Sequence, residues 1–102
     1  MVRHCVLFRW KSNVTKADID RVSDLLRSLP SSIPQIRSFC FGPDLGLVED
    51  NYDFAVVAEF DGESDYQVYA QHPQHLKVVG EGIKPLLEER VAVQHRTDTE
   101  SF

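Results

Sequence analysis

The chain has 102 residues, a length that suits one domain. Hydrophobic residues make up 42% and charged residues 26%, as in an ordinary globular protein, and 16 acidic against 11 basic residues leave a net charge of −5. This charge argues against nucleic acid or an anionic membrane as the main partner, and no apolar stretch approaches the roughly 18 residues of a membrane span.

The first third of the chain reads as a strand followed by a helix. Polar and apolar residues alternate over residues 2–10, which predicts a strand. Thr15 and Asp18 have the spacing of a capping box, and apolar residues then recur at helical intervals, so we expect a helix over residues 16–28. Two prolines and two serines over residues 30–34 predict a turn.

Two further strands follow, joined by a loop. Strand character returns over residues 36–41 and ends at a Gly-Pro pair. The acidic segment over residues 43–52 has no periodicity and is typical of a connecting loop. A second long apolar strand is predicted over residues 54–60.

A broken helix is expected after this strand. Ser64 and Gln67 have the spacing of a capping pair, and Pro73 interrupts the helix because proline disfavours helical geometry at the residue before it. A second helical piece can begin at Pro73 itself, since proline suits the first helical position. The first helical turn gains support from a short acidic run, Asp61, Glu63 and Asp65.

The chain closes with a short strand. Gly80 and Gly82 are expected to loosen the backbone before a final strand over residues 91–95, and residues 96–102 read as a polar, frayed tail. The order strand, helix, strand, strand, broken helix, strand is that of an α+β, ferredoxin-like βαββαβ protomer. One domain over residues 1–95 is therefore expected, with helices on one face of a four-stranded antiparallel sheet.

The two cysteines are expected to be reduced. In the predicted topology a third strand separates Cys5 from Cys40, which places them about 10 Å apart, too far for a disulfide. Arg3, His4 and Arg9 interrupt the N-terminal segment where a secretory signal needs an apolar core, so we expect a cytoplasmic protein.

The predicted sheet has two unlike faces. One face carries residues that suit contact with the helices, namely His4, Val6, Phe8, Trp10, Phe54, Val56, Ala58 and Phe60. The other carries Cys5, Leu7, Ala55 and Val57, with Arg3, Arg9 and Glu59 towards its rim. This second face is too apolar for water, and a homodimer that packs sheet against sheet would cover it. The alternative is a half-apolar face that stays solvated.

The segment from Tyr69 to His75 is the densest cluster of polar and aromatic residues. A bend at Pro73 would turn Tyr69 and His75 towards one space against the sheet, where His4 also points. An imidazole is a competent base near neutral pH, and a phenol donates a hydrogen bond to an oxyanion, so the group suits proton abstraction beside a carbonyl. The same residues also fit structural roles, with His72 capping a helix.

Metal and cofactor sites are less favoured by the sequence. Zinc could be held by His4, His72 and His75, but the spacing across a proline is not that of a helical ligand pair, so we expect no metal. The sequence has no glycine-rich phosphate loop, no Gly-x-Ser-x-Gly and no Cys-x-x-Cys motif, and we expect no cofactor.

Several motifs together resemble one family, the stress-responsive dimeric α/β-barrel domain. They are His4-Cys5-Val6-Leu7-Phe8, Ile33-Pro34-Gln35-Ile36, Phe41-Gly42, Tyr52-Asp53 and Tyr69-Ala70-Gln71-His72-Pro73-Gln74-His75. The resemblance implies a dimeric α+β barrel. The family includes heat-stable plant stress proteins and a plant polyketide cyclase that closes a poly-β-ketone by aldol condensation without a cofactor.

The resemblance to the cyclase implies roles for three residues. His75 would be the base, Tyr69 would stabilise the enolate, and His4 would orient the substrate. Val22 and Leu26 stand where the cyclase has bulky aromatics, so pocket shape is not inherited. Another departure is Gln94-His95, where the family often has Asp-Tyr.

The sequence therefore predicts two alternative functions. The first is a homodimer that binds a small carbonyl compound, with acid–base catalysis as a further step, in an apolar pocket. Its expected lining is His4, Val6, Phe8, Val22, Leu26, Val56, Ala58, Tyr69, His72, His75 and Leu86. The second is a non-enzymatic stress or assembly protein that acts through a stable dimer. A cavity of roughly 300 Å³ or more favours the first, and a filled core favours the second.

Overall fold

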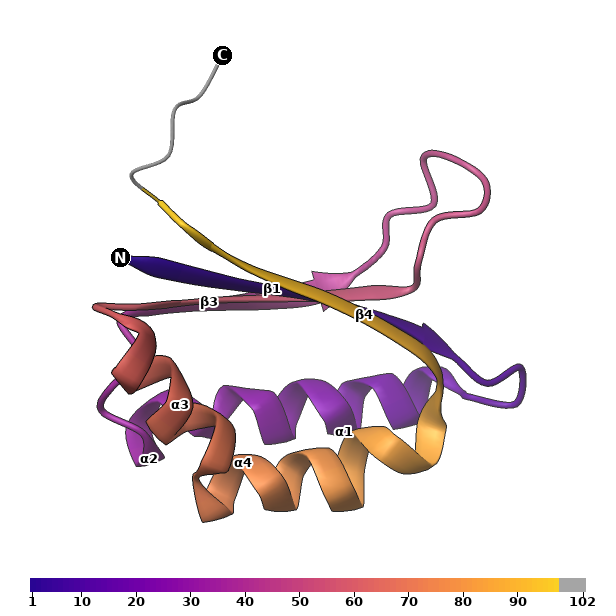
Figure 1. Ribbon diagram of the computed structural model, residues 1–102. Helices are drawn as coiled ribbons and strands as arrows, with labels where there is room; N and C mark the ends of the chain where they lie inside the picture. Colours follow the sequence, from indigo (N-terminus) through magenta and orange to yellow (C-terminus); the bar gives the residue numbers. More distant parts are fainter. Residues whose placement is uncertain (98–102) are drawn as a thin grey trace.

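A four-stranded antiparallel sheet, covered by helices on one face, makes up the body of the protein (Figure 1). The structure is a computed structural model and describes residues 1–97. The strands lie in the order β2-β3-β1-β4, with β1 at Val2–Trp10, β2 at Ser38–Pro43, β3 at Phe54–Phe60 and β4 at Leu87–Arg96. This is the ferredoxin-like arrangement predicted from the order of elements, which is confirmed.

The helical layer consists of two long arms. The first contains α1 (Lys16–Arg27) and the short α2 (Leu29–Ser32). The second contains α3 (Glu63–Gln71), α4 (Pro73–Lys77), the π-helical segment η1 (Val78–Ile83) and the 3₁₀ turn η2 (Lys84–Leu86). Both arms lie below the sheet in Figure 1, while the loop between β2 and β3 rises on the opposite side. One face of the sheet is therefore left open.

The first helix forms as its sequence predicts. The Thr15 hydroxyl accepts from the Asp18 backbone N–H at 3.2 Å, and the Asp18 carboxylate accepts from the Thr15 N–H at 2.9 Å, which completes the capping box. Val22 and Leu26, one turn apart, are buried against the sheet. The helix ends at Arg27 rather than Ser28, since Ser28 is its C-cap.

The start of α3 differs from the prediction. The helix begins at Glu63 with Gly62 as N-cap, and no side chain caps it, so the predicted Ser64 and Gln67 pair is wrong. Of the acidic run, two residues lie in the first helical turn, while Asp61 forms an ion pair with Arg37 at 2.7 Å. The acidic charge at this end suits the helix dipole without a side-chain cap.

The two glycines near the end of the helical layer do not loosen the chain. Residues 78–83 form a π-helical segment, and Gly82 is buried within it. A Cβ atom at Gly82 would lie 2.5 Å from Cδ1 of Leu25 on α1, so the glycine allows the two arms to approach closely. Likewise, the predicted turn over residues 30–34 contains the short helix α2, in which Pro30 occupies an early position that needs no N–H donor.

The last strand is longer than its sequence pattern suggests. It runs over Leu87–Arg96 and pairs with the whole length of β1, from Val2↔Arg96 to Trp10↔Leu87. Its first residues, Leu-Glu-Glu-Arg, lack strand alternation, so only pairing with β1 makes them a strand. The second strand is also displaced from the predicted residues 36–41 to Ser38–Pro43.

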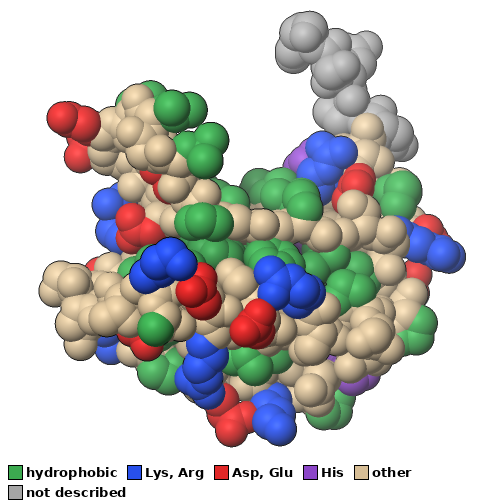
Figure 2. All heavy atoms as spheres, turned by 180° about the vertical axis from the view of Figure 1, so that it is seen from behind, with side chains coloured by type: hydrophobic (Ala, Val, Ile, Leu, Met, Phe, Trp, Pro, Cys, Tyr) green, Lys and Arg blue, Asp and Glu red, His purple; other side chains and the backbone are tan. Residues whose placement is uncertain are grey.

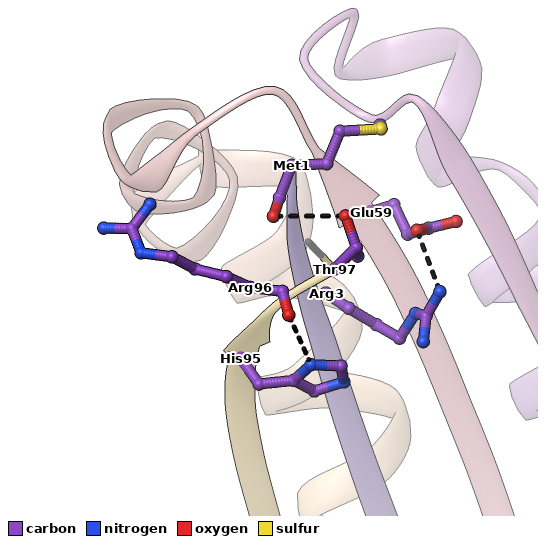
Figure 3. A network of polar contacts seen from close by, with 6 residues as sticks. All are labelled: Met1, Arg3, Glu59, His95, Arg96 and Thr97. Atoms are coloured by element: carbon purple, nitrogen blue, oxygen red, sulfur yellow. Dashed lines mark hydrogen bonds and ion pairs between the residues drawn. The ribbon is translucent and has the colours of Figure 1, made fainter. Parts of the chain in front are cut away.

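The end of β4 is tied to the start of the chain. The backbone N–H of Thr97 donates to the carbonyl of Met1 at 3.0 Å. The Thr97 hydroxyl donates to the same carbonyl at 3.5 Å, and Arg3 forms an ion pair with Glu59 at 3.3 Å on the neighbouring strand (Figure 3). Arg96 therefore belongs to the sheet and not to the predicted tail. The remainder of that tail, residues 98–102, lies outside the described residues.

The two faces of the sheet are divided as predicted. The helix-covered face holds the core, in which His4, Val6, Phe8, Phe54, Val56, Ala58 and Phe60 are buried. On the open face Cys5 is paired with Val57, and Val57 is paired with Cys40 on its other side. Both cysteines are free thiols, as expected from this separation by one strand.

Candidate functional site

His4 lies on the inner strand β1, on the helix-covered face, where it is only 4% exposed. It is paired in register with Gln94 of β4, whose Nε2 donates a hydrogen bond to His4 Nδ1 at 2.8 Å. Because Nδ1 accepts, the proton of the neutral ring is on Nε2. The pKa of His4 is lowered to about 4, mainly by burial and to a smaller extent by the charges of Arg90 and His75. His4 is therefore neutral at pH 7 and retains one N–H donor.

The break between α3 and α4 positions the second histidine. His72 has an extended backbone, as expected before a proline, and α4 begins at Pro73. The Nδ1 atom of His72 accepts a hydrogen bond from the backbone N–H of Gln74 at 3.1 Å and so caps α4. The resulting bend brings the rings of Tyr69 and His75 to a centroid distance of 4.2 Å.

His75 has the opposite tautomer to His4. Its Nδ1 donates a hydrogen bond to the backbone carbonyl of Ala70 at 3.1 Å. Since a carbonyl oxygen can only accept, the proton is on Nδ1 and Nε2 carries the free lone pair. Burial lowers the pKa of His75 most strongly, the Ala70 carbonyl opposes this effect, and the charges of Arg90 and His72 add to the lowering. His75 is thus a neutral acceptor at pH 7.

Tyr69 lies between the two histidines on α3 and is 3% exposed. Its ring centroid is 6.1 Å from that of His4, and the ring centroid of Tyr66, on the same helix, lies 5.1 Å from that of His4. Burial and, to a smaller extent, Tyr66 raise the pKa of Tyr69 well above its ordinary value, while Arg90 acts in the opposite direction. The phenol therefore stays protonated at neutral pH and acts as a hydrogen-bond donor.

A cavity of about 220 Å³ lies between the sheet and the helical layer, and His4, Tyr69 and His75 all line it. The rest of its wall is mostly apolar: Val6, Phe8, Leu26, Val56, Tyr66, Val79, Ile83, Leu87 and Arg90. The volume is below the roughly 300 Å³ at which pockets for drug-sized ligands begin, so the space suits a small molecule.

The structure brings part of the predicted lining together at this cavity. Seven of the expected residues line the cavity: His4, Val6, Phe8, Leu26, Val56, Tyr69 and His75. Four do not, namely Val22, Ala58, His72 and Leu86. Val22 and Ala58 are fully packed inside the core at 1% and 0% exposure, and His72 is engaged as a helix cap.

Sequence reasoning missed five lining residues: Tyr66, Val79, Ile83, Leu87 and Arg90. Tyr66 precedes Tyr69 by three residues on the same helix, a spacing that places both on one face. The two residues from β4 were missed because the predicted strand began too late. Gln94, which fixes the tautomer of His4, was noted only as a departure from the family pattern, and the strand register would have revealed its role.

A metal site and a second hollow are the alternatives to this cavity. No three His, Cys, Asp or Glu side chains in residues 1–97 form a group that could hold a metal ion. A larger hollow, of about 500 Å³, lies on the open face beneath the β2–β3 loop, between Leu7, Ala55 and Leu47. It contains no histidine, whereas the cavity under the helices combines a base, a phenol and an N–H donor.

A four-stranded antiparallel sheet with helices on one face and a histidine-lined cavity beneath them defines a ferredoxin-like α+β protein. The chain belongs to the stress responsive A/B barrel domain family, Dabb, whose model matches residues 2–95. In the part of the chain that the structure describes, no helix has the length and apolar character to cross a membrane.

Solved structures with the same fold include dimers and an enzyme. A dimeric ferredoxin-like protein of unknown function from Thermobifida fusca is 46% identical, with a TM-score of 0.86 over 92% of this chain and 88% of that one. A dimeric protein from Bacteroides fragilis is 26% identical, with a TM-score of 0.81 over 92% and 93%. The hydroxynitrile lyase from Passiflora edulis is 25% identical, with a TM-score of 0.84 over 98% and 96%. No curated protein matches the chain.

Proposed function

We propose that the protein is a homodimer that binds a small carbonyl compound under its helical layer and removes a proton next to the carbonyl group. The observation that carries this proposal is the pair of opposite histidine tautomers in one cavity. His75 offers a free acceptor nitrogen, while His4 offers an N–H donor. A base and a donor in one apolar space are the requirements for forming and stabilising an enolate.

The proposed step uses three side chains. Nε2 of His75 takes a proton from the carbon next to the carbonyl, and the C–H electron pair becomes the C=C bond of the enolate. The carbonyl oxygen takes up the negative charge and accepts hydrogen bonds from the Tyr69 hydroxyl and His4 Nε2. Transfer of the proton from His75 back to carbon, or attack of the enolate on a second carbonyl, completes the reaction. No cofactor is needed for this step.

The similarity to the hydroxynitrile lyase from Passiflora edulis supports acid–base chemistry on this scaffold. A hydroxynitrile is the adduct of cyanide and a carbonyl compound. The likeness spans nearly the whole of both chains, and it therefore includes the strands and helices that form the cavity.

Exchange of carbon-bound protons tests the proposal directly. We would incubate the protein with 2-pentanone in D₂O and follow the loss of the α-proton signals by NMR. We expect catalysed exchange, a loss of at least about a hundredfold in rate for His75→Ala, and a smaller loss for Tyr69→Phe, in line with the usual contribution of a general base.

The matched control is His95→Gln. His95 is an exposed histidine on the opposite face of the sheet, outside the cavity, so this variant should exchange protons like the wild type. Exchange by His75→Ala at the wild-type rate would exclude His75 as the base. Absence of exchange in the wild type, together with absence of ketone binding, would reject the function.

The dimer is proposed to form through the open face. Its two central rows of residues across the sheet are apolar: Val93–Cys5–Val57–Cys40 and Val91–Leu7–Ala55–Gly42. The row His95–Arg3–Glu59 bounds them at one end (Figure 3). The Glu89–Arg9 pair bounds them at the other end. An apolar centre with a polar rim is the usual anatomy of a protein interface.

The β2–β3 loop adds to this surface. Leu45 and Leu47 are 82% and 81% exposed on the loop, and Val93 on β4 is 57% exposed. Figure 2 shows hydrophobic side chains on the projecting loop and along the open face beside it. A second copy of the same surface would cover all of these residues, and the relatives described as dimeric support this arrangement.

A pair of valine variants tests the interface. Val93→Glu should give a monomer in sedimentation velocity at micromolar concentration, because it buries a charge in the apolar centre. Val68→Glu changes a valine of similar exposure on α3, in the helical layer, and should remain dimeric. A monomeric wild type, or a dimeric Val93→Glu, would reject this interface.

A non-enzymatic role is the second candidate. The cavity volume of about 220 Å³ lies below the roughly 300 Å³ of a pocket for a drug-sized ligand, while the core is not filled, so a protein that acts through its dimer surface is the alternative to one that binds a small ligand. The exchange experiment separates the two functions. Under this second role, ketones neither bind nor exchange while the dimer is intact.

A further inference from the structure

Arg90 is the one strongly charged residue in the wall of the cavity. It lies on β4 opposite Phe8, which is buried on the helix-covered face, so its side chain starts on the same side of the sheet as the cavity. Arg90 itself is exposed, which places it at the mouth of the cavity.

No acidic side chain within residues 1–97 forms an ion pair with Arg90. The nearby acidic residue Glu89 is paired with Arg9 across the strands, and Glu88, two positions along β4, forms no ion pair with Arg90. By contrast, Arg3, Arg37 and Arg96 each have a carboxylate partner. The charge of Arg90 is therefore left available for a ligand.

The field of Arg90 reaches the reacting groups. Its positive charge contributes to the lowered pKa of His4 and His75 and opposes the raised pKa of Tyr69. The three groups are those that surround the proposed carbonyl position. Arg90 would thus attract a negatively charged ligand whether the charge lies inside the cavity or at its mouth.

We infer that Arg90 binds a carboxylate, and that the ligand is a short oxo acid with its carbonyl group between His75 and Tyr69. A guanidinium group matches a carboxylate with two parallel N–H donors. A phosphate ester fits less well, because phosphate sites usually add backbone N–H groups from a helix N-terminus, and the remaining wall here is mostly apolar. This inference rests on the proposed function and specifies its substrate class.

The volume of the cavity agrees with a ligand of this size. About 220 Å³ accommodates the ketone end of a five-carbon oxo acid, while the carboxylate remains at the mouth with Arg90. A second effect follows from the same charge. An enolate formed in the cavity is negative, and Arg90 favours it over the neutral ketone.

Binding of a matched ligand pair tests the inference. The probes are 4-oxopentanoate and its methyl ester, which share the ketone and differ in the negative charge. Titration followed by NMR at low salt should show that the wild type binds the acid at least about tenfold more tightly than the ester, the value expected for a charge-assisted hydrogen bond. The preference should decrease as salt is raised, since Arg90 is exposed.

Two variants complete the design. Arg90→Gln should bind the acid and the ester equally, with the affinity for the ester unchanged from the wild type. Arg21→Gln removes the same charge from an exposed position on α1, outside the cavity, and should keep the preference for the acid.

The possible failures are distinguishable. Equal binding of acid and ester by the wild type overturns the role of Arg90 and leaves the proposed function intact. A preference for the acid that persists in Arg90→Gln likewise overturns it. Binding of neither probe rejects the carbonyl-binding function together with this inference.

Discussion

The carboxylate of Asp53 accepts a hydrogen bond from the backbone N–H of Trp10 at 2.8 Å. The backbone N–H of Asp53 donates to the carbonyl of Phe8 at 2.8 Å. Asp53 therefore makes two hydrogen bonds to the backbone at the end of β1. The contact lies beside the register shift between Arg9 and Trp10, where β1 departs from regular pairing with β4. The Asp53 side chain thus supplies the hydrogen-bond acceptor for the Trp10 N–H, just before β3 begins at Phe54.

Removal of this contact should destabilise the fold. We expect Asp53→Ala to lower the free energy of unfolding by about 1 to 3 kcal/mol, because the Trp10 N–H loses a charged acceptor. Asp53→Asn keeps an amide oxygen and should lose less. Urea denaturation measures both, with the exposed loop variant Glu49→Ala as the control. A loss for Asp53→Ala no larger than that of the control would contradict the role.

The opposite tautomers of His4 and His75 can be tested by NMR spectroscopy. At pH 7, ¹⁵N NMR should find the proton on Nε2 of His4 and on Nδ1 of His75, because their partners are the Gln94 amide and the Ala70 carbonyl. Gln94→Glu replaces the donor by a carboxylate. It should move the His4 proton to Nδ1 and raise the pKa of His4, since a nearby negative charge favours the imidazolium. An unchanged His4 spectrum in Gln94→Glu would exclude the Gln94 contact.

Stability should fall as the solution becomes acidic. His4 has a pKa of about 4 in the folded protein against its ordinary value of 6.5, so between these pH values the unfolded chain binds more protons. The contribution of His4 to the free energy of unfolding is therefore complete above about pH 6.5, and it is lost as the pH falls towards 4. Its size is about 3 kcal/mol at most, from 1.36 kcal/mol per pKa unit.

Comparison with His4→Gln isolates this contribution from that of the carboxylates. Urea denaturation at pH 7 and pH 4.5 should show a larger acid loss for the wild type than for the variant. The lowered pKa of His75 acts in the same direction and remains in both proteins. Equal acid losses in the two proteins would show that His4 is not buried as a neutral ring.

The close approach of the two helical arms predicts a contrast between two glycines. Gly82→Ala should lower the free energy of unfolding by about 0.5 to 1.5 kcal/mol, because its Cβ would lie 2.5 Å from Cδ1 of Leu25 and the end of that flexible side chain has to shift. Gly80→Ala meets no atom within 4 Å and should be neutral or slightly stabilising.

A double-mutant cycle checks the cause. Leu25→Ala removes the clashing methyl group, so Gly82→Ala should cost less in the Leu25→Ala background than in the wild type. Thermal unfolding of the four proteins gives the coupling. If the cost of Gly82→Ala is the same in both backgrounds, contact with Leu25 is not its origin.

Local patterns in the sequence were enough for much of the fold. Alternation over residues 2–10 and 54–60 identified β1 and β3 and the face that each residue occupies, because side chains on a strand alternate with a period of two. The capping box of α1 and the bend at Pro73 were likewise predicted, since both depend on residues close together in the chain. These signals also placed His4, Tyr69 and His75 together at one cavity.

Contacts between distant segments were decided only by the tertiary structure. Gln94 meets His4, and Arg90 enters the cavity wall, because β4 pairs with β1 in a particular register over its full length. No pattern within Leu87–Arg90 specifies that pairing, and a strand with weak alternation takes its conformation from its neighbour. The histidine tautomers have the same origin, since each is fixed by a hydrogen-bond partner that folding brings to the ring.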